Sequence, residues 1–398
     1  MTLGLDLYQS AGVGVVALLL GLLFTRKIPF LKRYCIPAPV SGGLLISLLT
    51  LCLYAFGGVE CHFDGTLRDL CMVAFFTSVG FQCDLSVLKK GGRSLLLMIL
   101  LVAGLIVVQN LLSVGIARGL GQDALLGMAA GSIPMCGGHG TAGGFSPLLE
   151  EMGLSGAASI TMAAANFGLV AGSLLGGPLA EGLIRRRHLA ESSATPEGKP
   201  DGGTASASPA APTETIQAVC MLLLAMALGT CLNRLLALTG ITFPTYFGAL
   251  IVAAVLRNLL SLSPRWQHSR QVERIASVGE ICLLLFLGMA MSFLRLWELA
   301  SIALPLCLIL VAQVAFMALY AVFVAFPLLG RDYDGAVLVS GLCGFGLGAT
   351  PNAMANMSAV CFKYRYAVNP FIVVPIVGAM FVDIINTGVV TLFLNLIR

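Results

Sequence analysis

The sequence predicts an all-α polytopic membrane protein with about ten transmembrane helices in two inverted five-helix repeats, each with a Gly-rich re-entrant hairpin. Apolar residues make up 58% of the 398 positions and charged residues only 11%, whereas a soluble domain carries about 25% charged residues. Uncharged runs of helical length recur along the chain, and several short motifs recur at nearly one offset. This composition excludes a soluble enzyme, a nucleic-acid-binding protein and a disordered chain.

The first repeat is expected over residues 1–188. No basic residue precedes its first uncharged run and Asp6 lies at its head, so we interpret the run as a span and not as a signal peptide. The five expected spans are Leu7–Thr25, Tyr34–Val59, Leu70–Cys83, Ser94–Ala117 and Met152–Ala180.

A stretch rich in Ser, Ala, Pro and Gly separates the two halves. Residues 189–215 have too few apolar side chains to form a core and are expected to be a flexible cytoplasmic linker. The second repeat is expected over residues 216–398, with its first run beginning at the end of the linker. Its spans are Thr215–Asn233, Leu235–Leu256, Ile281–Leu294, Leu299–Gly330 and Tyr366–Ile397, the last interrupted only by Asp383.

Two further uncharged runs are unsuited to unbroken helices. Residues 124–149 contain seven Gly together with Pro134 and Pro147, and residues 335–362 contain five Gly together with Pro351. Gly and Pro at this density destabilise a continuous helix. We therefore expect two re-entrant hairpins, which enter the membrane and return on the same side.

The basic residues indicate the orientation. If the N- and C-termini lie outside, 18 Lys and Arg residues fall on inner connections and 5 on the outer side, as the positive-inside rule requires. If either hairpin were a full span, the later connections would lie on the opposite sides of the membrane. The excess of basic residues on the inner side would then be smaller. The expected location is the bacterial inner membrane.

Three features of the first half recur in the second. PVSGG, from Pro39, matches PTYFG, from Pro244, at an offset of 205; the short spans match at about 211, and GGHGT matches GLGAT at 209. Five spans per half is an odd number, so the second half is inverted. Inverted repeats with broken elements are typical of secondary transporters, whose binding site lies near the midplane. The alternative is that the glycines only allow close helix packing.

Several motifs carry a resemblance to a known family. The hairpin motifs SIPMCGGHGT (Ser132–Thr141) and CGFGLGATPNAMANM (Cys343–Met357), together with FVDIIN (Phe381–Asn386), resemble the bacterial sodium/glutamate symporters. So do the patterns Tyr34–Leu45 and Leu296–Pro305. The resemblance implies sodium-driven glutamate uptake through ten spans and two pore loops. The chain departs from the family pattern at Cys136, where Ser is usual, and at Asn352, where Thr is usual.

The two hairpins are the candidate substrate site. Glycines leave backbone N–H groups free to face a cavity, and successive N–H groups form an anion-binding nest suited to a carboxylate. Hydroxyl and amide side chains add donors and acceptors, and unwound carbonyl groups suit Na⁺. The alternative is a structural kink whose backbone binds water. The candidate residues are Gly137, Gly138, His139, Gly140, Thr141, Gly348, Ala349, Thr350, Asn352 and Asn356.

Polar residues deep in the other spans are the candidate Na⁺ ligands, namely Asp383, Asn386, Asn166 and Ser78. Asp383 could bind Na⁺, the substrate ammonium or a proton, or could be a neutral acid that bonds a neighbouring helix. His139 could contact substrate, carry a proton or be structural. Membrane amides such as Gln109 and Gln313 more often join helices.

No cofactor is expected, and Na⁺ enters as the co-transported ion. An intramembrane enzyme is disfavoured because HExxH is absent and only one carboxylate lies deep. A channel is disfavoured because a filter needs rings of repeated loops. The remaining alternative is a sodium symporter for another dicarboxylate or hydroxycarboxylate. The expected partners are L-glutamate, Na⁺, the lipid bilayer and a second copy of the chain in a homodimer, with no nucleic acid.

Overall fold

The computed structural model describes residues 2–33, 36–86, 92–189, 212–240, 242–262 and 270–397. Its elements in chain order are β1 (Thr2–Leu5), α1 (Leu7–Lys27), α2 (Pro29–Arg33), α3 (Ala38–Gly57), β2 (Glu60–Phe63), α4 (Thr66–Gln82), α6 (Gly92–Gly119), α7 (Ala124–Ala129), α8 (Ser132–Met135), α9 (Gly138–Glu151), α10 (Ala157–Arg186), α11 (Pro212–Ala237), α12 (Phe247–Leu260), α14 (Gln271–Ser292), the 3-10 helix η1 (Leu296–Ile302), α15 (Ala303–Tyr320), the π-helical turn η2 (Ala321–Ala325), α16 (Phe326–Leu328), α17 (Tyr333–Gly346), α18 (Thr350–Lys363), α19 (Val368–Ile376), the π-helical turn η3 (Val377–Phe381) and α20 (Val382–Ile397).

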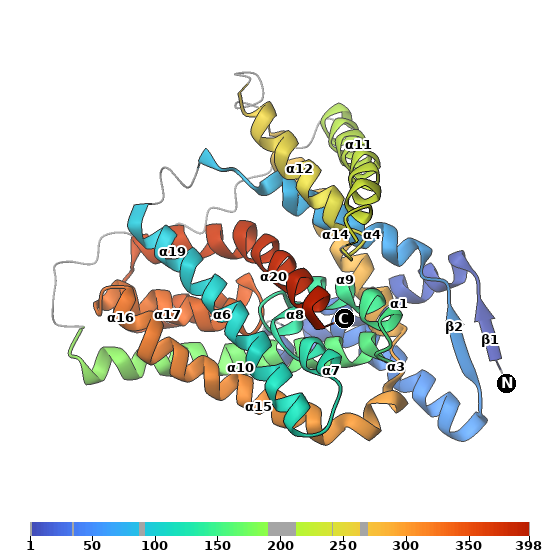
Figure 1. Cartoon of the computed structure of the whole chain (residues 1–398), viewed down its shortest axis with the longest axis horizontal. Helices are drawn as coiled ribbons and strands as arrows, with labels where there is room; N and C mark the ends of the chain where they lie inside the picture. The colour runs from blue at the N-terminus through green and yellow to red at the C-terminus, as the bar shows by residue number, and fades with distance from the viewer. Residues whose placement is uncertain are drawn as a thin grey trace.

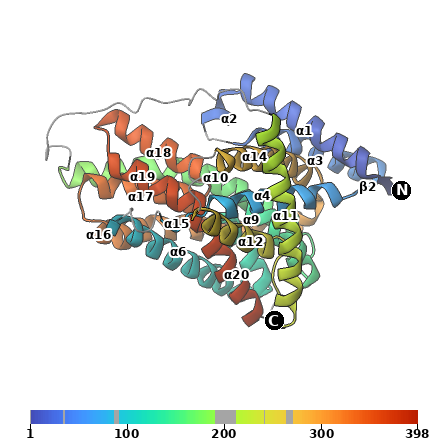
Figure 2. The same cartoon turned by 90° about the horizontal axis from the view of Figure 1, so that it is seen from above.

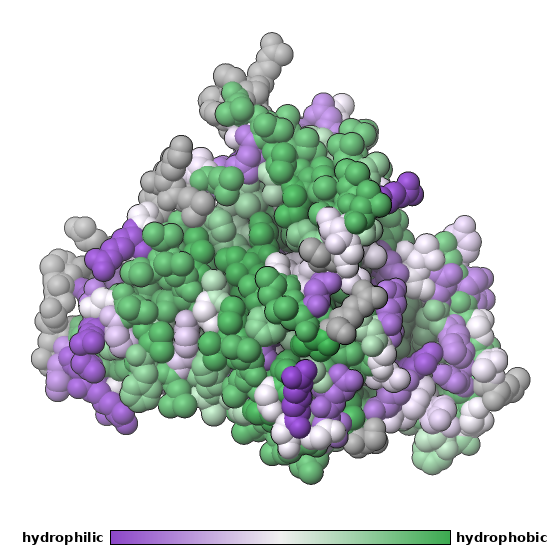
Figure 3. Space-filling model, viewed as in Figure 1, coloured by the Kyte–Doolittle hydropathy of each residue, from purple (hydrophilic) through white to green (hydrophobic). Residues whose placement is uncertain are grey.

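The helices confirm a polytopic membrane protein. Eight helices in the described ranges are long and apolar enough to cross a membrane. Helix α12 is a shorter apolar helix of 14 residues, and α4 has 17 residues. Strands β1 and β2 form a small parallel pair, with Thr2 opposite Glu60, that joins the N-terminus to the α3–α4 connection. Hydrophilic residues lie mostly at the edges of the face seen in Figure 3, around a broad apolar surface.

Local sequence explains several helix ends. Asp6 and Gln9 form a reciprocal capping box at the start of α1, in which each side chain accepts a backbone hydrogen bond from the other. Helix α3 begins after Pro37 and ends at Gly58, whose φ of 59° is the left-handed conformation that glycine adopts readily.

Two expected span boundaries in the second half are wrong. Helix α12 begins at Phe247, twelve residues after the expected start of the span at Leu235, because Gly240 turns with φ 74° and Pro244 lacks an N–H. Helix α14 begins at Gln271, ten residues before Ile281, because a polar first segment containing Glu273 extends the helix beyond its apolar run. The linker falls mainly on residues 190–211, outside the described ranges, and α11 already begins at Pro212.

The helices form two groups that meet along a seam. The first helix group contains α1, α3, α4, α11, α12 and α14, and the second contains α6 to α10 and α15 to α20. In Figure 2 the first helix group lies on the right and the second mostly on the left. Figure 1 shows α20 and α6 beside the broken helices α7 and α8 of the first hairpin, inside the second helix group.

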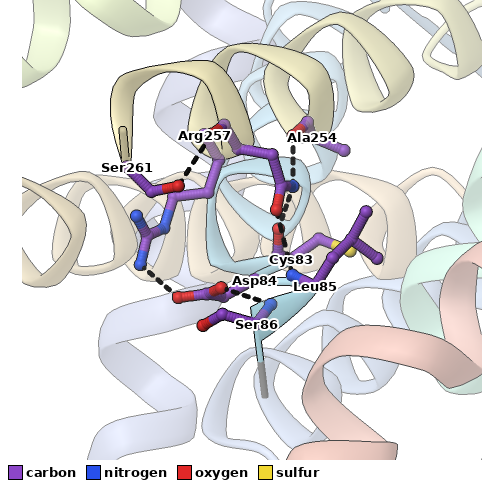
Figure 4. A network of polar contacts seen from close by, with 8 residues as sticks. Cys83, Asp84, Leu85, Ser86, Ala254, Arg257 and Ser261 are labelled. Atoms are coloured by element: carbon purple, nitrogen blue, oxygen red, sulfur yellow. Dashed lines mark hydrogen bonds and ion pairs between the residues drawn. The ribbon is translucent and has the colours of Figure 1, made fainter. Parts of the chain in front are cut away.

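Small residues and polar contacts hold the first helix group together. A Cβ at Gly21 or Gly42 would overlap the backbone of the facing helix, so these glycines let α1 and α3 approach closely. Figure 4 shows a clasp between α12 and the residues that follow α4: Arg257 bonds Asp84 at 2.8 Å, and Asn258 donates to the Cys83 carbonyl at 2.8 Å. The clasp fixes two short helices from different halves of the chain.

Buried amides hold the second helix group together. Gln109 in α6 donates to the Gly346 carbonyl at 2.9 Å, and Gln313 in α15 donates to the Gln109 carbonyl at 2.8 Å. This confirms that these two amides join helices. The π-helical turn η3 widens the last helix immediately before Asp383, and such turns frequently occur at functional sites.

Candidate substrate and ion site

The two Gly-rich segments both break at the edge of the second helix group that faces the seam. The first is helical to Met135 and resumes as α9 at Gly138, whose φ of 60° is left-handed. The second is helical to Gly346 and resumes as α18 at Thr350 after the extended residue Ala349. A helix N-terminus carries a partial positive charge and exposed N–H groups, so each break presents an anion-binding end.

Both breaks line one cavity of about 310 Å³ at the seam between the helix groups. The first helix group supplies mainly apolar wall from α4 and α14, including Phe75, Val79, Leu283 and Leu287. Eight predicted site residues line the cavity: Gly137, Gly138, His139, Gly140, Gly348, Ala349, Thr350 and Asp383. The glycines and prolines that favour kinks therefore predicted where the cavity lies. The apolar residues of its wall could not be predicted, because in the sequence they look like any other apolar residue of a span.

The backbones of the two breaks approach closely. A Cβ added at Gly138 would lie 2.9 Å from the Gly348 carbonyl oxygen. Because Gly138 also has a positive φ, a larger residue there would strain the chain and press on the second break. The anion-binding ends of α9 and α18 thus meet across a short gap.

His139 is bound by a residue from α10. Its Nε2 lies 2.9 Å from Oδ1 of Asn166, and since an amide oxygen can only accept, Nε2 donates. The ring is 5% exposed and lines the cavity. The structure thus brings a predicted substrate residue and a predicted Na⁺ ligand together, with Asn166 orienting the imidazole.

Asp383 faces the cavity beside a hydroxyl that has no other partner. The Thr141 hydroxyl lies close enough to the Asp383 carboxylate to interact with it, but it is buried and forms no hydrogen bond of standard geometry. Among the described residues, Asp383 is the only acidic one that lines the cavity, and no Lys or Arg lines it. A carboxylate beside an unsatisfied hydroxyl presents hard oxygen ligands suited to Na⁺.

Asn386 joins three elements. Its Oδ1 accepts a hydrogen bond from the Ser132 hydroxyl at 2.6 Å and its Nδ2 donates to the Ser132 carbonyl at 3.1 Å. Asn110 in α6 donates to the same hydroxyl at 2.8 Å. This network anchors the first hairpin to α6 and α20, and Asn386 does not line the cavity. Ser132 was not among the predicted site residues, because its partners are remote in sequence.

Asn352 and Asn356 attach the second hairpin to α10. Their side-chain amides donate to the carbonyls of Leu169 at 2.8 Å and Gly172 at 2.9 Å. The two residues share a face, as their spacing predicts, but neither lines the cavity. Of the two departures from the family pattern, Cys136 lies in the cavity wall and Asn352 lies outside it.

Ser78 lies at a helix crossing. Its hydroxyl donates to the Phe75 carbonyl at 2.7 Å, and a Cβ at Gly279 of α14 would overlap it. The structure therefore places Ser78 between α4 and α14 and not beside Asp383. It stays a prediction as a Na⁺ ligand.

The hairpins, the cavity and its single carboxylate agree with what a comparison with known proteins finds. A family model described as sodium/glutamate symporter matches residues 3–366. The chain belongs to the sodium/glutamate symporter family. Within this family, it is 42% identical over 402 residues to the sodium/glutamate symporters of Escherichia coli (strain K12) and Shigella flexneri, covering 98% of each chain. It is 35% identical over 387 residues to that of Haemophilus influenzae (strain ATCC 51907 / DSM 11121 / KW20 / Rd), covering 96% of this chain and 95% of the relative.

Membership identifies a transporter and not an enzyme. For a symporter-family chain the cavity has the expected chemistry: two anion-binding helix ends and one carboxylate within a mainly apolar wall. The sequence motifs that indicated the family, GGHGT and GLGAT, are the segments in which the two hairpins break.

Proposed function

We propose that this protein imports L-glutamate across the bacterial inner membrane, coupled to Na⁺, by alternating access. One observation carries the proposal: the N-termini of α9 and α18 and the carboxylate of Asp383 meet in a single cavity at the seam between two helix groups. L-glutamate has two carboxylates and one ammonium. The relatives are named sodium/glutamate symporters, which supports the same substrate and ion here.

In this proposal each helix end binds a carboxylate. Backbone N–H groups around Gly137 to Gly140 serve one carboxylate, and those around Gly348 to Thr350 serve the other. His139, oriented by Asn166, adds a side-chain contact. Asp383 and Thr141 hold Na⁺, whose charge offsets that of the buried carboxylate. Asn386 acts indirectly by fixing the first hairpin.

We further propose ten spans in two inverted repeats, with the hairpins as re-entrant segments. Helix starts in the two halves support this: Leu7 and Pro212 are 205 residues apart, Ala38 and Phe247 are 209 apart, and Ala157 and Val368 are 211 apart. The bias in basic residues supports termini on the outer side. The cavity then opens toward the cytoplasm, because Pro37 and Gln82 at inner helix ends line it. The homodimer stays a proposal, which cross-linking in membranes would test.

Uptake into liposomes tests the function. Purified protein should accumulate L-glutamate when external Na⁺ is high, and replacing Na⁺ with K⁺ should abolish accumulation. An inside-negative potential should speed uptake if each cycle moves net positive charge, since one charge gains about 2.3 kcal/mol per 100 mV. Unchanged uptake in K⁺ would refute sodium coupling. Preferred uptake of malate or citrate would assign the protein to another dicarboxylate or hydroxycarboxylate.

A further inference from the structure

A second cavity of about 430 Å³ lies at the other end of the seam, which the proposed orientation places outside. Strand β2, helix α4 and the residues that follow α14, from Phe293 to Glu298, line one side, and α9 and α10 of the second helix group line the other. Unlike the cavity at the hairpins, it is rich in charged side chains: Arg68, Arg295, Glu150 and Glu298 all face it. We call it the outer cavity, and the cavity at the hairpins the inner cavity.

The same helices connect the two cavities. Helix α4 contributes Arg68 to the outer cavity and Phe75 to the inner one, and α9 contributes Ser146 and Gly140. These pairs are six or seven residues apart, which at 1.5 Å per residue is about 10 Å. Leu287 of α14 lines the inner cavity, and Phe293, which directly follows α14, lines the outer one. The two cavities therefore lie along the same helices, separated by a distance close to the length of an amino acid.

Three buried aromatic rings pack together beside the helices that connect the two cavities, and none of them lines either cavity. The rings of Phe76 and Tyr246 stack with centroids 3.8 Å apart, and Phe145 packs edge-on against Tyr246 at 6.1 Å. A Cβ at Gly144 would overlap the Tyr246 ring, so this glycine of α9 leaves room for it. The two cavities share no lining residue, so protein separates the outer cavity from the inner one in this structure.

Of the two cavities, only the outer one is lined by cationic side chains, within the described residues. The inner cavity contains no Lys or Arg, so no cationic side chain there meets the second carboxylate of an acidic amino acid. In the outer cavity, Arg295 lies 3.7 Å from Glu60 and 3.6 Å from Glu298, too far for hydrogen bonds. Arg68 is paired with its neighbour Asp69, a half-exposed residue, at 2.9 Å. Such exposed pairs are weak, and a ligand carboxylate can compete with them.

We propose that the outer cavity is a vestibule that binds the acidic amino acid before translocation. Arg295 and Arg68 bind its carboxylates, and Glu298 faces its ammonium. A charged first site raises the local concentration of an anionic substrate at the outer end of the seam. This inference rests on the proposed function, because it takes the seam as the transport path.

Uptake kinetics at low ionic strength test the vestibule. Arg295→Gln and the double variant Arg68→Gln, Arg295→Gln should raise the KM for external glutamate by about twofold to fivefold, the size expected of a partly exposed ion pair. The maximal rate should not change, and the effect should shrink in high salt. Arg118→Gln, which removes an arginine at the end of α6 that lines neither cavity, is the matched control. A wild-type KM in the double variant, or the same rise in the control, would overturn the proposal.

Direct binding separates this inference from the proposed function. Saturation-transfer NMR on the full chain in nanodiscs, with L-glutamate in Na⁺-free K⁺ buffer, should detect weak binding that Arg295→Gln removes. If wild-type liposomes accumulate glutamate but this signal is absent or independent of Arg295, the vestibule is wrong and the proposed function stands. If the signal depends on Arg295 but no glutamate is transported, the proposed function fails and the binding site stands.

Discussion

Asp383 is the residue whose placement says most about coupling. An ionised carboxylate at mid-membrane depth costs about 2.5 to 3.5 kcal/mol on insertion scales, and this one faces a cavity in which no described residue is cationic. The buried Thr141 hydroxyl beside it forms no hydrogen bond of standard geometry. A bound Na⁺ would neutralise the carboxylate and satisfy the hydroxyl at the same time.

Asp383→Asn should fold but require much more Na⁺, because Asn keeps the size and loses the charge. We expect the Na⁺ concentration for half-maximal glutamate uptake to rise about tenfold or more, the loss typical of a contact to a charged group. Uptake measured across a Na⁺ series checks this, with the exposed acid variant Glu273→Gln as the control. A loss of glutamate affinity with an unchanged Na⁺ response would assign Asp383 to the substrate ammonium.

The sequence indicates which polar residues lie within the spans, but not which residues they contact. His139 and Asn166 were both singled out, and the 2.9 Å contact between them depends on how α9 packs on α10. Asn386 shares a helical face with Asp383, yet Ser132, 254 positions away, occupies its side chain. Such pairings depend on tertiary contacts that no local pattern encodes.

Elements with unusual composition were predicted best. The glycines and prolines of the two hairpins predicted breaks, and both breaks occur, at Cys136–Gly137 and at Leu347–Ala349. Uncharged runs were poorer guides to helix ends, since the sequence from Leu235 to Leu256 carries no charge and yet α12 begins only at Phe247. The pairing of α4 with α12 could not be predicted, and polar contacts between the two ends secure it.

Breaking the clasp between α4 and α12 should destabilise the first helix group. The side chains of Arg257 and Asp84 are only 16% and 21% exposed, so Asp84→Asn leaves a largely buried guanidinium without its partner. We expect the free energy of unfolding to fall by about 2 kcal/mol. The thermal unfolding midpoint in detergent should be several degrees lower. The double variant Asp84→Arg, Arg257→Asp, which exchanges the two charges, should recover part of the lost stability.

Glu214→Gln is the matched control, since Glu214 contacts Arg274 at 3.4 Å but is 41% exposed, and exposed pairs contribute little. An equal drop in the unfolding midpoint for this variant and for Asp84→Asn would show that the clasp has no special role.

At the scale of the whole molecule, the seam between the two helix groups determines which side has access to the hairpins. The sequence predicted a site where the hairpins meet, and the structure places that meeting at the edge of the second helix group, against α4 and α14. The apolar wall residues could not be distinguished beforehand from residues that face lipid. Only the packing of the two helix groups shows which apolar residues line the cavity and which face lipid.

Access to the inner cavity should be one-sided. In a variant without other cysteines, Ala349→Cys should react with a membrane-impermeant maleimide from the cytoplasmic side, and Na⁺ with glutamate should slow the reaction. Ser78→Cys should stay unreactive, because Ser78 packs against Gly279. Mass spectrometry of labelled vesicles of known orientation measures both. Labelling of Ala349→Cys from outside only would reverse the topology, and substrate-protected labelling at position 78 would restore Ser78 to the site.

The thin layer of protein between the two cavities has a consequence for how voltage acts. If water fills both cavities, the membrane potential falls mainly across about 10 Å of protein and not across the roughly 30 Å of a bilayer core. The electric field inside that layer is then about three times stronger than in the surrounding lipid. A charge that crosses the layer gains the full energy of the potential over about a third of the membrane thickness.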